Sequence, residues 1–590
     1  MALPRRGWMT VEECLPDHNL AQGLGHGLLH CGALFSVAQW SIISVCALFL
    51  LLPRESHAQS APPPSAPPAG KAPSTPSPAP VPPRPAEPAS PQKAANPSAP
   101  THITPEQARQ LFSSVDAILQ FDSKVTGLPV SQSVKRRLVT RDEVEKYLMH
   151  QLQNDRDAKR LQSSELVLKK FGLLDRDFQL KPFLIQLLRE QIAGYYDDKT
   201  KTVNLLDWIP PDQQKPVLAH ELTHALQDQH IHLEKWDRED ERPIPKNVQQ
   251  DNEHIATDEE DTVRDTVVEG QAMAAFVDYI LAPTGKTLLT APQVVDKMNH
   301  AMGDSSDSPT LADAPLVLQR SLIFPYVAGL NFVRAVWTAK GTQAAFAGML
   351  DHPPSSTYEI MNPKAYLTQS PVPLLRMPDI HSLIDSQYQP YDIGVMGEFD
   401  VQLMAELFGG QAAADALAPA WRGGIYYTAQ SRQAATASAK DSTASLALLY
   451  LSRWATPEAA LAFANLYAGE IPRKYDDAVL APADDADTPH GSIVTRIWNT
   501  SEGPVFVVVS GKTVFISESF PMDLARKLEF VMMGSIVDSA TSVTVQNRMP
   551  PEDLTGALRS WLFALSAPEE KRMHDILTTL QPRSTGLVAR

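Results

Sequence analysis

The chain has 590 residues, of which 43% are hydrophobic, and its formal net charge at pH 7 is −16. A chain of this length and composition can bury more than one hydrophobic core. Its acidic balance argues against nucleic acid as a partner, because phosphate backbones bind basic surfaces. All three cysteines precede residue 60, so the sequence excludes a disulfide framework in the rest of the chain.

The first predicted element is an apolar run at residues 33–52, which is followed by the small residues Ser56 and Ala58. This order is typical of a signal peptide and its cleavage site. About 20 apolar residues also span a bilayer, so the run can instead remain as a membrane tether. In both cases we expect an exported protein, periplasmic or extracellular, with residues 1–58 as a signal peptide or N-terminal anchor.

Residues 59–100 consist almost entirely of Pro, Ala and Ser. Such a composition cannot bury a core, so we expect a disordered linker. Helices are expected from residue 101 to about residue 193. Thr104 before Pro105 is an N-cap with proline at the first helical position, and Thr140 with Glu143 is a capping-box pattern.

A β-hairpin is predicted at residues 195–206, where Tyr195 and Tyr196 precede a polar turn and an apolar strand. An edge strand at this place can pair with the main chain of an extended peptide substrate. A hairpin with a purely structural role is the simpler interpretation of the same residues.

The strongest motif is the run VLAHELTHALQDQ at residues 217–229, which places His220, Glu221 and His224 in an apolar helical segment. Side chains four residues apart lie on one face of a helix, about 6 Å apart along its axis, so the two histidines can bind one cation. Neutral imidazoles are typical zinc ligands, and a catalytic zinc keeps one position for water. Glu221 lies beside the first ligand, where its carboxylate can accept a proton from that water. The pattern predicts one Zn²⁺ ion, although the same spacing also arises by chance on solvated helix faces.

His230 is one candidate for the third ligand, because it has the spacing of a three-histidine zinc site. That pattern requires a glycine where this chain has Gln227, so that the chain can leave the helix. If the helix continues, His230 lies about 9 Å beyond His224 and cannot reach the same ion.

Glu269 is the other candidate, in a second predicted helix that can cross the first. Gly270 and Ala272 beside it leave room for close contact between helices. An exposed glutamate at the start of a helix would be the simpler interpretation of this residue alone. Together with the histidines, we predict Glu269 as the third metal ligand.

Three runs of the chain resemble a group of secreted bacterial gluzincin-like zinc metallopeptidases. They are REQIAGYYDDKTKTV at residues 189–203, HELTHALQDQ at 220–229 and VEGQA at 268–272, with further matches at residues 324–333 and 353–366. The resemblance implies a zincin fold and zinc-dependent hydrolysis of peptide bonds. The pattern of this group has a histidine where this chain has Asn362.

Between the two ligand helices, the acidic residues 237–261 are predicted to form an exposed loop. A helix is expected at residues 321–350. Tyr326 in it is a candidate donor to the oxyanion of a tetrahedral intermediate. A core tyrosine whose hydroxyl is bonded locally is the simpler interpretation.

From about residue 385 the pattern changes to short apolar runs typical of strands. Strands are predicted at residues 424–428, 445–451, 492–498, 504–509 and 513–517, and helices at 457–467 and 522–535. We therefore predict an α+β domain with an antiparallel sheet at residues 385–570, followed by a tail at 571–590.

The predicted fold class is α+β, with a largely helical zincin-like catalytic domain at residues 101–384 that contains a short hairpin. The predicted function is that of a secreted zinc metallopeptidase that cuts a protein or peptide substrate, with Glu221 as general base. The alternative is a non-catalytic exported protein with a structural zinc site and a C-terminal domain that binds a partner. Asn362 favours this alternative.

Overall fold

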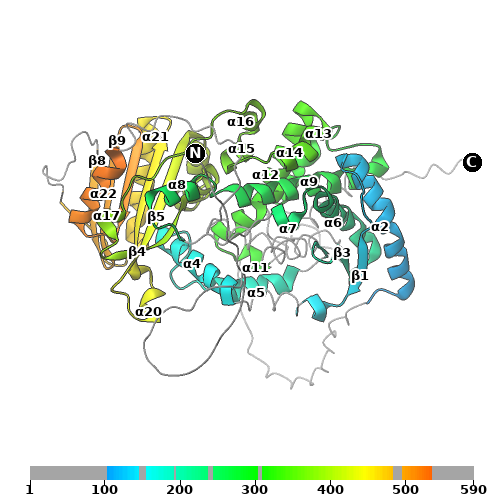
Figure 1. Cartoon of the computed structure of the whole chain (residues 1–590), viewed down its shortest axis with the longest axis horizontal. Coiled ribbons are helices and arrows are strands. Elements are labelled where there is room, and N and C mark those ends of the chain that lie inside the picture. The colour runs from blue at the N-terminus through cyan, green and yellow to red at the C-terminus, as the bar shows by residue number, and fades with distance from the viewer. Residues whose placement is uncertain are drawn as a thin grey trace, which may run out of the picture. The chain divides into compact units, whose positions relative to one another are not determined.

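The computed structural model describes residues 102–144, 146, 155–191, 194–236, 244–302, 309–482 and 494–534 (Figure 1). The signal peptide or anchor, the linker and the tail predicted at residues 1–58, 59–100 and 571–590 lie outside these residues. The described chain is largely helical up to residue 385 and then forms an antiparallel sheet, which confirms the predicted α+β class. The predicted domain boundary at residue 385 stays a prediction.

All but one of the longer helices of the first region contribute buried residues to one hydrophobic core, whereas Ile255, at the end of the remaining helix, lies in a second cluster. They are α2 (Pro105–Thr126), α4 (Asp155–Phe171), α5 (Leu180–Gln191), α6 (Pro211–Ile231), α8 (Val248–Ile255), α9 (Glu260–Leu281), α10 (Gln293–Met302) and α12 (Leu316–Lys340). The shorter ones are α7 (Leu233–Trp236), α11 (Pro309–Ala312), α13 (Thr342–Ala345), α14 (Ala347–Asp351), α15 (Thr357–Met361), α16 (Pro363–Thr368) and α17 (His381–Ile384).

A three-stranded sheet accompanies these helices. Strands β2 (Tyr195–Asp197) and β3 (Thr202–Leu206) pair antiparallel, which confirms the predicted hairpin. A third strand, β1 (Lys135–Val139), pairs parallel to β3, so the order is β1-β3-β2. In this sheet β2 is an edge strand.

The prediction of an exposed loop at residues 237–261 was wrong for its second half. There α8 begins after Asn247, whose side chain accepts hydrogen bonds from the next helical N–H groups. Asp251 and His254 on this helix are buried, and Asp251 is paired with His381. The inward face of this helix carries polar residues, whose burial depends on partners far away in the sequence. It therefore lacks the apolar periodicity by which a buried helix is recognised, and the segment was predicted to be a loop.

The core of the helical region is built around α9, which lies against α6, α2 and α12 (Figure 1). It crosses α12 at Gly270 and Gly329. A Cβ atom at Gly329 would lie 3.0 Å from the Gly270 Cα and closer still to the Thr266 carbonyl oxygen. Gly270 therefore lies at a close helix contact, but its partner is α12 and not the helix of His220 and His224, for which the contact was predicted. Any larger side chain at this crossing would push α9 and α12 apart.

The second region contains a seven-stranded antiparallel sheet. Its strands are β4 (Tyr388–Val395), β5 (Trp421–Ser431), β6 (Leu446–Trp454), β7 (Val479–Leu480), β8 (Val494–Thr500), β9 (Gly503–Ser510) and β10 (Thr513–Glu518), in the order β4-β5-β6-β10-β9-β8-β7. All five predicted strands overlap strands of this sheet, whereas β4 and β7 were not predicted.

Helices cover both faces of the seven-stranded sheet, because successive side chains of a strand point to opposite faces. Tyr426 and Tyr450 lie in the core cluster that contains Phe463 of α21 (Pro457–Lys474). The neighbouring Tyr427 lies in the cluster that contains Leu528 of α22 (Met522–Gly534). The remaining helices are α18 (Glu398–Gly409), α19 (Gln411–Leu417) and α20 (Ala437–Lys440).

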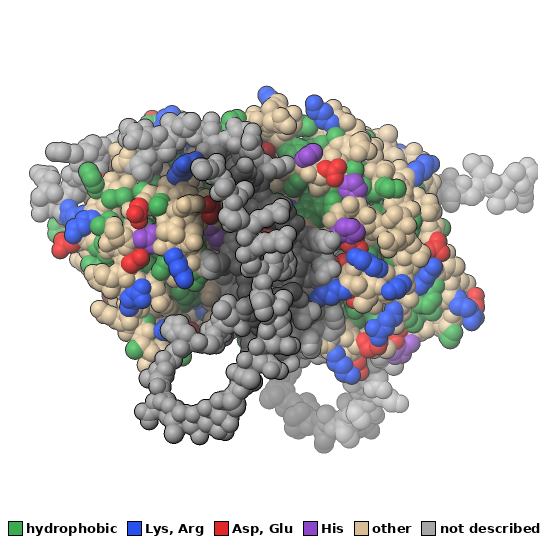
Figure 2. Space-filling view, in the orientation of Figure 1, with side chains coloured by type: hydrophobic (Ala, Val, Ile, Leu, Met, Phe, Trp, Pro, Cys, Tyr) green, Lys and Arg blue, Asp and Glu red, His purple; other side chains and the backbone are tan. Residues whose placement is uncertain are grey.

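Helix α12 is long and apolar enough to cross a membrane by length and composition, but 67% of its most apolar window is buried inside the protein. On the face drawn in Figure 2, Lys and Arg side chains lie among Asp and Glu side chains, and they do not gather in one basic patch.

A buried charge cluster joins the end of α4 and the segment after it to the seven-stranded sheet. The Lys170 ammonium group is fully buried and lies 2.9 Å from a carboxylate oxygen of Glu502, which also pairs with Arg176. Burial by itself would raise the pKa of Glu502, but Lys170, Arg176 and Thr443 lower it to about 2. Breaking such a pair leaves a buried charge without its counter-ion.

The first prediction concerns the helix crossing. Gly329→Ala should lower the free energy of unfolding by about 2 kcal/mol or more, because the added methyl group has no room. Gly469→Ala is the matched control: this glycine lies inside α21 and a Cβ there meets nothing within 4 Å. The control should raise stability by about 0.5–1 kcal/mol. Urea denaturation measures the free energy of unfolding of both variants. Equal changes in the two would contradict the close contact between α9 and α12 at Gly329.

The second prediction concerns the pH dependence of stability. Because the folded-state pKa of Glu502 lies below its ordinary value of 4.5, the pair contributes stability above about pH 4.5 that is lost as the pH falls toward 2. Glu502→Gln should therefore cost about 3 kcal/mol near neutral pH, and its difference from the wild type should shrink on acidification. Asp212→Asn, at an exposed pair with Lys215, is the control and should change the free energy of unfolding far less than Glu502→Gln near neutral pH.

Candidate metal centre

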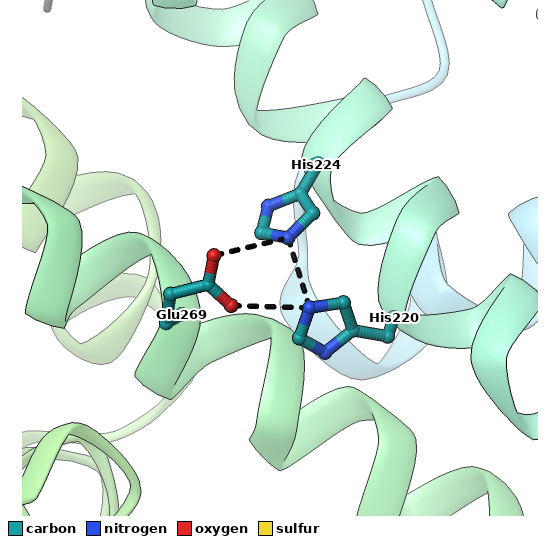
Figure 3. A group of neighbouring side chains, drawn as sticks. All are labelled: His220, His224 and Glu269. Atoms are coloured by element: carbon teal, nitrogen blue, oxygen red, sulfur yellow. Dashed lines mark hydrogen bonds and ion pairs between the residues drawn. The ribbon is translucent and has the colours of Figure 1, made fainter. Parts of the chain in front are cut away.

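Two turns of α6 and one turn of α9 bring three side chains together, and Figure 3 shows them pointing toward one another. The Nε2 atoms of His220 and His224 lie 3.0 Å apart. Glu269 places one carboxylate oxygen 3.1 Å from the His220 Nε2 and the other 3.7 Å from the His224 Nε2. Among the described residues, this is the one group of three or more His, Cys, Asp or Glu side chains whose ligand atoms all lie within 4.8 Å of one another. The three side chains predicted as ligands therefore meet, and the group could hold a metal ion.

The distances fit a metal of the expected size. Ligand atoms at 2.0–2.1 Å from a tetrahedral zinc ion are about 3.3 Å from one another. The three separations, from 3.0 to 3.7 Å, lie around this value. Two imidazole nitrogens and one carboxylate oxygen also form a donor set that divalent transition metals accept.

Burial fixes the protonation of the ligands. It lowers the pKa of His220 to about 3 and that of His224 to about 4, so both rings are neutral near neutral pH. Burial raises the pKa of Glu269 to about 7, while His224 and the hydroxyl of Tyr326 lower it. An ionised carboxylate between two neutral rings is costly in a buried site, and a divalent cation would offset that cost.

Glu221, the predicted general base, is not one of the three converging side chains. It is buried, and its Oε2 accepts a hydrogen bond of 2.9 Å from the main-chain N–H of Tyr196. Tyr196 lies on the edge strand β2, so the small sheet holds this carboxylate in place. The same bond already uses one N–H of the strand that was predicted to pair with a peptide.

Tyr326 lies beside the ligands. Its ring is 6.3 Å from that of His220 with 23° between the planes, and its side chain is buried. Its hydroxyl approaches Glu269 closely enough to lower the pKa of that carboxylate. The crossing of α9 and α12 produces this arrangement, because Gly329 lies in the turn of α12 that follows Tyr326.

The side chains of His230 and Asn362 bond to residues other than the three ligands. Helix α6 continues to Ile231, and the His230 Nε2 pairs with Asp351 at 3.0 Å. His230 is therefore not a ligand, which agrees with the expectation from a continuous helix. The Asn362 side chain donates to Glu398 at 2.6 Å and to the Tyr358 carbonyl oxygen. No bond between Asn362 and a ligand residue is found in the described chain.

Sequence reasoning missed two residues of the site, Gln227 and Gln271. The Gln227 Oε1 lies 2.8 Å from the Nδ1 of His224, and its amide nitrogen donates to Gln271. The spacing of three between His224 and Gln227 could have indicated this contact, since such side chains are neighbours on a helix. The role of Gln271 as the partner of Gln227 is visible only in the tertiary structure, because the two residues lie on different helices.

Comparisons of the chain with protein-family models, with curated proteins and with solved structures found no match.

The third prediction is that the protein binds one divalent metal ion per chain. His224→Ala and Glu269→Ala should each abolish stoichiometric binding, because two ligands hold such an ion far less tightly than three. His230→Ala should retain it. Metal content after dialysis against a buffered metal solution measures this, and full occupancy in both ligand variants would contradict the assigned site.

Proposed function

We propose that the protein is a zinc-dependent hydrolase of peptide bonds. The observation that carries the proposal is the buried group of His220, His224 and Glu269 with Glu221 next in sequence to the first ligand. The resemblance to secreted bacterial gluzincin-like metallopeptidases supports it. Export to the periplasm or the cell exterior, through residues 33–52, belongs to the same proposal.

Zinc is favoured by the donor set. Two imidazoles and one carboxylate are the three protein ligands typical of catalytic zinc, whereas Mg²⁺ and Ca²⁺ prefer oxygen ligands alone. When bound, zinc lowers the pKa of a coordinated water to about 7 and polarises the scissile carbonyl.

Glu221 is the proposed general base. Its Oε2 is held by the Tyr196 N–H, so the carboxylate has a fixed direction. In this role it accepts a proton from the attacking water and then transfers it to the leaving amine. Its place next to His220 in α6 suits this role, because a base must lie close to the proton that it takes.

Tyr326 is a proposed donor to the oxyanion of the tetrahedral intermediate. A neutral phenol hydroxyl beside the metal ligands can stabilise negative charge as it develops. The hydroxyl also lies close enough to Glu269 to orient this ligand instead. Tyr326→Phe distinguishes the two roles, since loss of the oxyanion donor lowers kcat while loss of an orienting bond weakens metal binding.

The second candidate is an exported protein in which the metal site has a structural role. Complete burial of the His220 and Glu269 side chains favours it, because structural zinc sites are closed. Asn362 at the position of a histidine in the resembling group favours it as well. In this case the C-terminal sheet region would be the part that binds a partner.

The fourth prediction separates the two candidates. Glu221→Gln should leave the metal content unchanged and lower peptide cleavage by at least about 100-fold, because proton transfer is lost while the ligands remain. Glu253→Gln, at an exposed position of α8, is the matched control and should keep both. Cleavage of a peptide library with zinc-loaded protein measures the activity.

Full turnover by Glu221→Gln would refute the assigned base. A wild-type protein that holds one zinc ion and cuts no peptide in the library would support the structural candidate.

A further inference from the structure

We propose that Gln227 and Gln271 form a relay of two amides that fixes the tautomer of His224 and so points the lone pair of its Nε2 at the metal site. Both glutamines are positioning residues, since neither belongs to the converging ligand group. The inference deepens the proposed metal site and rests on it for its function.

The relay begins at two main-chain carbonyl groups. The Gln271 amide nitrogen lies 2.8 Å from the Ala345 oxygen and 3.1 Å from the Phe346 oxygen. A carbonyl oxygen only accepts hydrogen bonds, so the NH₂ group of Gln271 must face these two atoms. Its Oε1 must then point the other way, toward Gln227.

The orientation of Gln227 follows from the same rule. Its amide nitrogen lies 3.0 Å from the Gln271 Oε1 and 3.0 Å from the Val268 oxygen. Both are acceptors in this arrangement, so the NH₂ group of Gln227 must occupy this side. The Gln227 Oε1 is thereby turned toward the His224 ring.

The contact between Gln227 and His224 determines which nitrogen of the imidazole ring carries the proton. The Gln227 Oε1 lies 2.8 Å from the His224 Nδ1 and can only accept, so this ring nitrogen carries the proton. In a neutral imidazole the other nitrogen then has the lone pair, and the His224 Nε2 is the atom that faces His220 and Glu269. Burial favours a fixed relay, because both glutamine side chains are fully excluded from solvent.

An amide in this place differs from the carboxylate that often supports a ligating histidine. A carboxylate accepts the same proton but adds a negative charge and makes the ring more basic. Gln227 supplies the geometry without a charge, in a site where Glu269 already needs a cation. The relay also joins α6, α9 and the end of α13, so the tautomer depends on how these three elements are packed together.

The test is a nitrogen NMR spectrum of the full-length protein, labelled in histidine only and free of metal. His224 should show a protonated Nδ1 and an unprotonated Nε2 near neutral pH. In Gln227→Leu this single tautomer should give way to a mixture, and metal affinity should fall about 10- to 100-fold. Gln271→Leu should give a smaller change of the same kind, because Val268 still holds the Gln227 amide.

Gln229→Leu is the matched control on the same helix. This side chain bonds to the Ser131 and Gln132 main chain and does not reach the imidazole, so the tautomer and the affinity should stay as in the wild type. If Gln227→Leu does not fold, the spectra of the wild type and of Gln271→Leu still test whether the relay fixes the His224 tautomer.

A wild-type His224 with the proton on Nε2, or an unchanged tautomer in both relay variants, would overturn the relay. The spectrum needs neither metal nor turnover, so it separates this inference from the proposed function. If His224 has the expected tautomer but the protein binds no metal, the proposed function is contradicted and the relay is still supported.

Discussion

The structure of the helical region depends on one close contact, where α9 crosses α12 at Gly270 and Gly329. Two helices without side chains at their crossing approach one another more closely than ordinary core helices do. The residue before Gly270 is Glu269, and Tyr326 lies one turn before Gly329. The same contact therefore holds a metal-ligand candidate and a hydrogen-bond donor next to each other. Because α6 also packs against α9, the remaining two ligand candidates are brought to the same point.

Burial of polar side chains is the second constraint. Helix α6 is buried over most of its length and carries His220, Glu221, His224, Gln227 and Asp228 into the interior. Each of these side chains has a defined partner, since an unsatisfied polar group in a core is costly. Glu221 is held by the edge strand, Asp228 accepts from the Tyr196 hydroxyl, and Gln227 holds His224. A site built in this way has ligands that are oriented before any ion binds, which is what tight and selective metal binding requires.

The seven-stranded sheet region has a different character. Its buried charges form ion pairs and hydrogen-bonded clusters, such as Lys474 with Glu518 and the tyrosines beside them. These pairs resemble structural cross-links, because each charge is neutralised by its neighbour within the fold. The described part of this region contains no group of three His, Cys, Asp or Glu side chains arranged for a metal. The chemistry we propose therefore belongs to the helical region.

The sequence by itself determined the local features of this protein. Periodicity and caps were enough to predict α2, α6, α9 and most strands of the large sheet, because these signals depend on neighbours along the chain. The spacing of His220 and His224 placed both on one helix face, and this needs no tertiary information. Only the tertiary structure decided that Glu269 reaches the same point, that Tyr326 stands beside it, and that Gln271 supports His224 through Gln227. It also decided that α8 is a buried helix and that β1 joins the small sheet. These features depend on contacts between residues far apart in the chain, and such contacts leave no periodic pattern in the sequence.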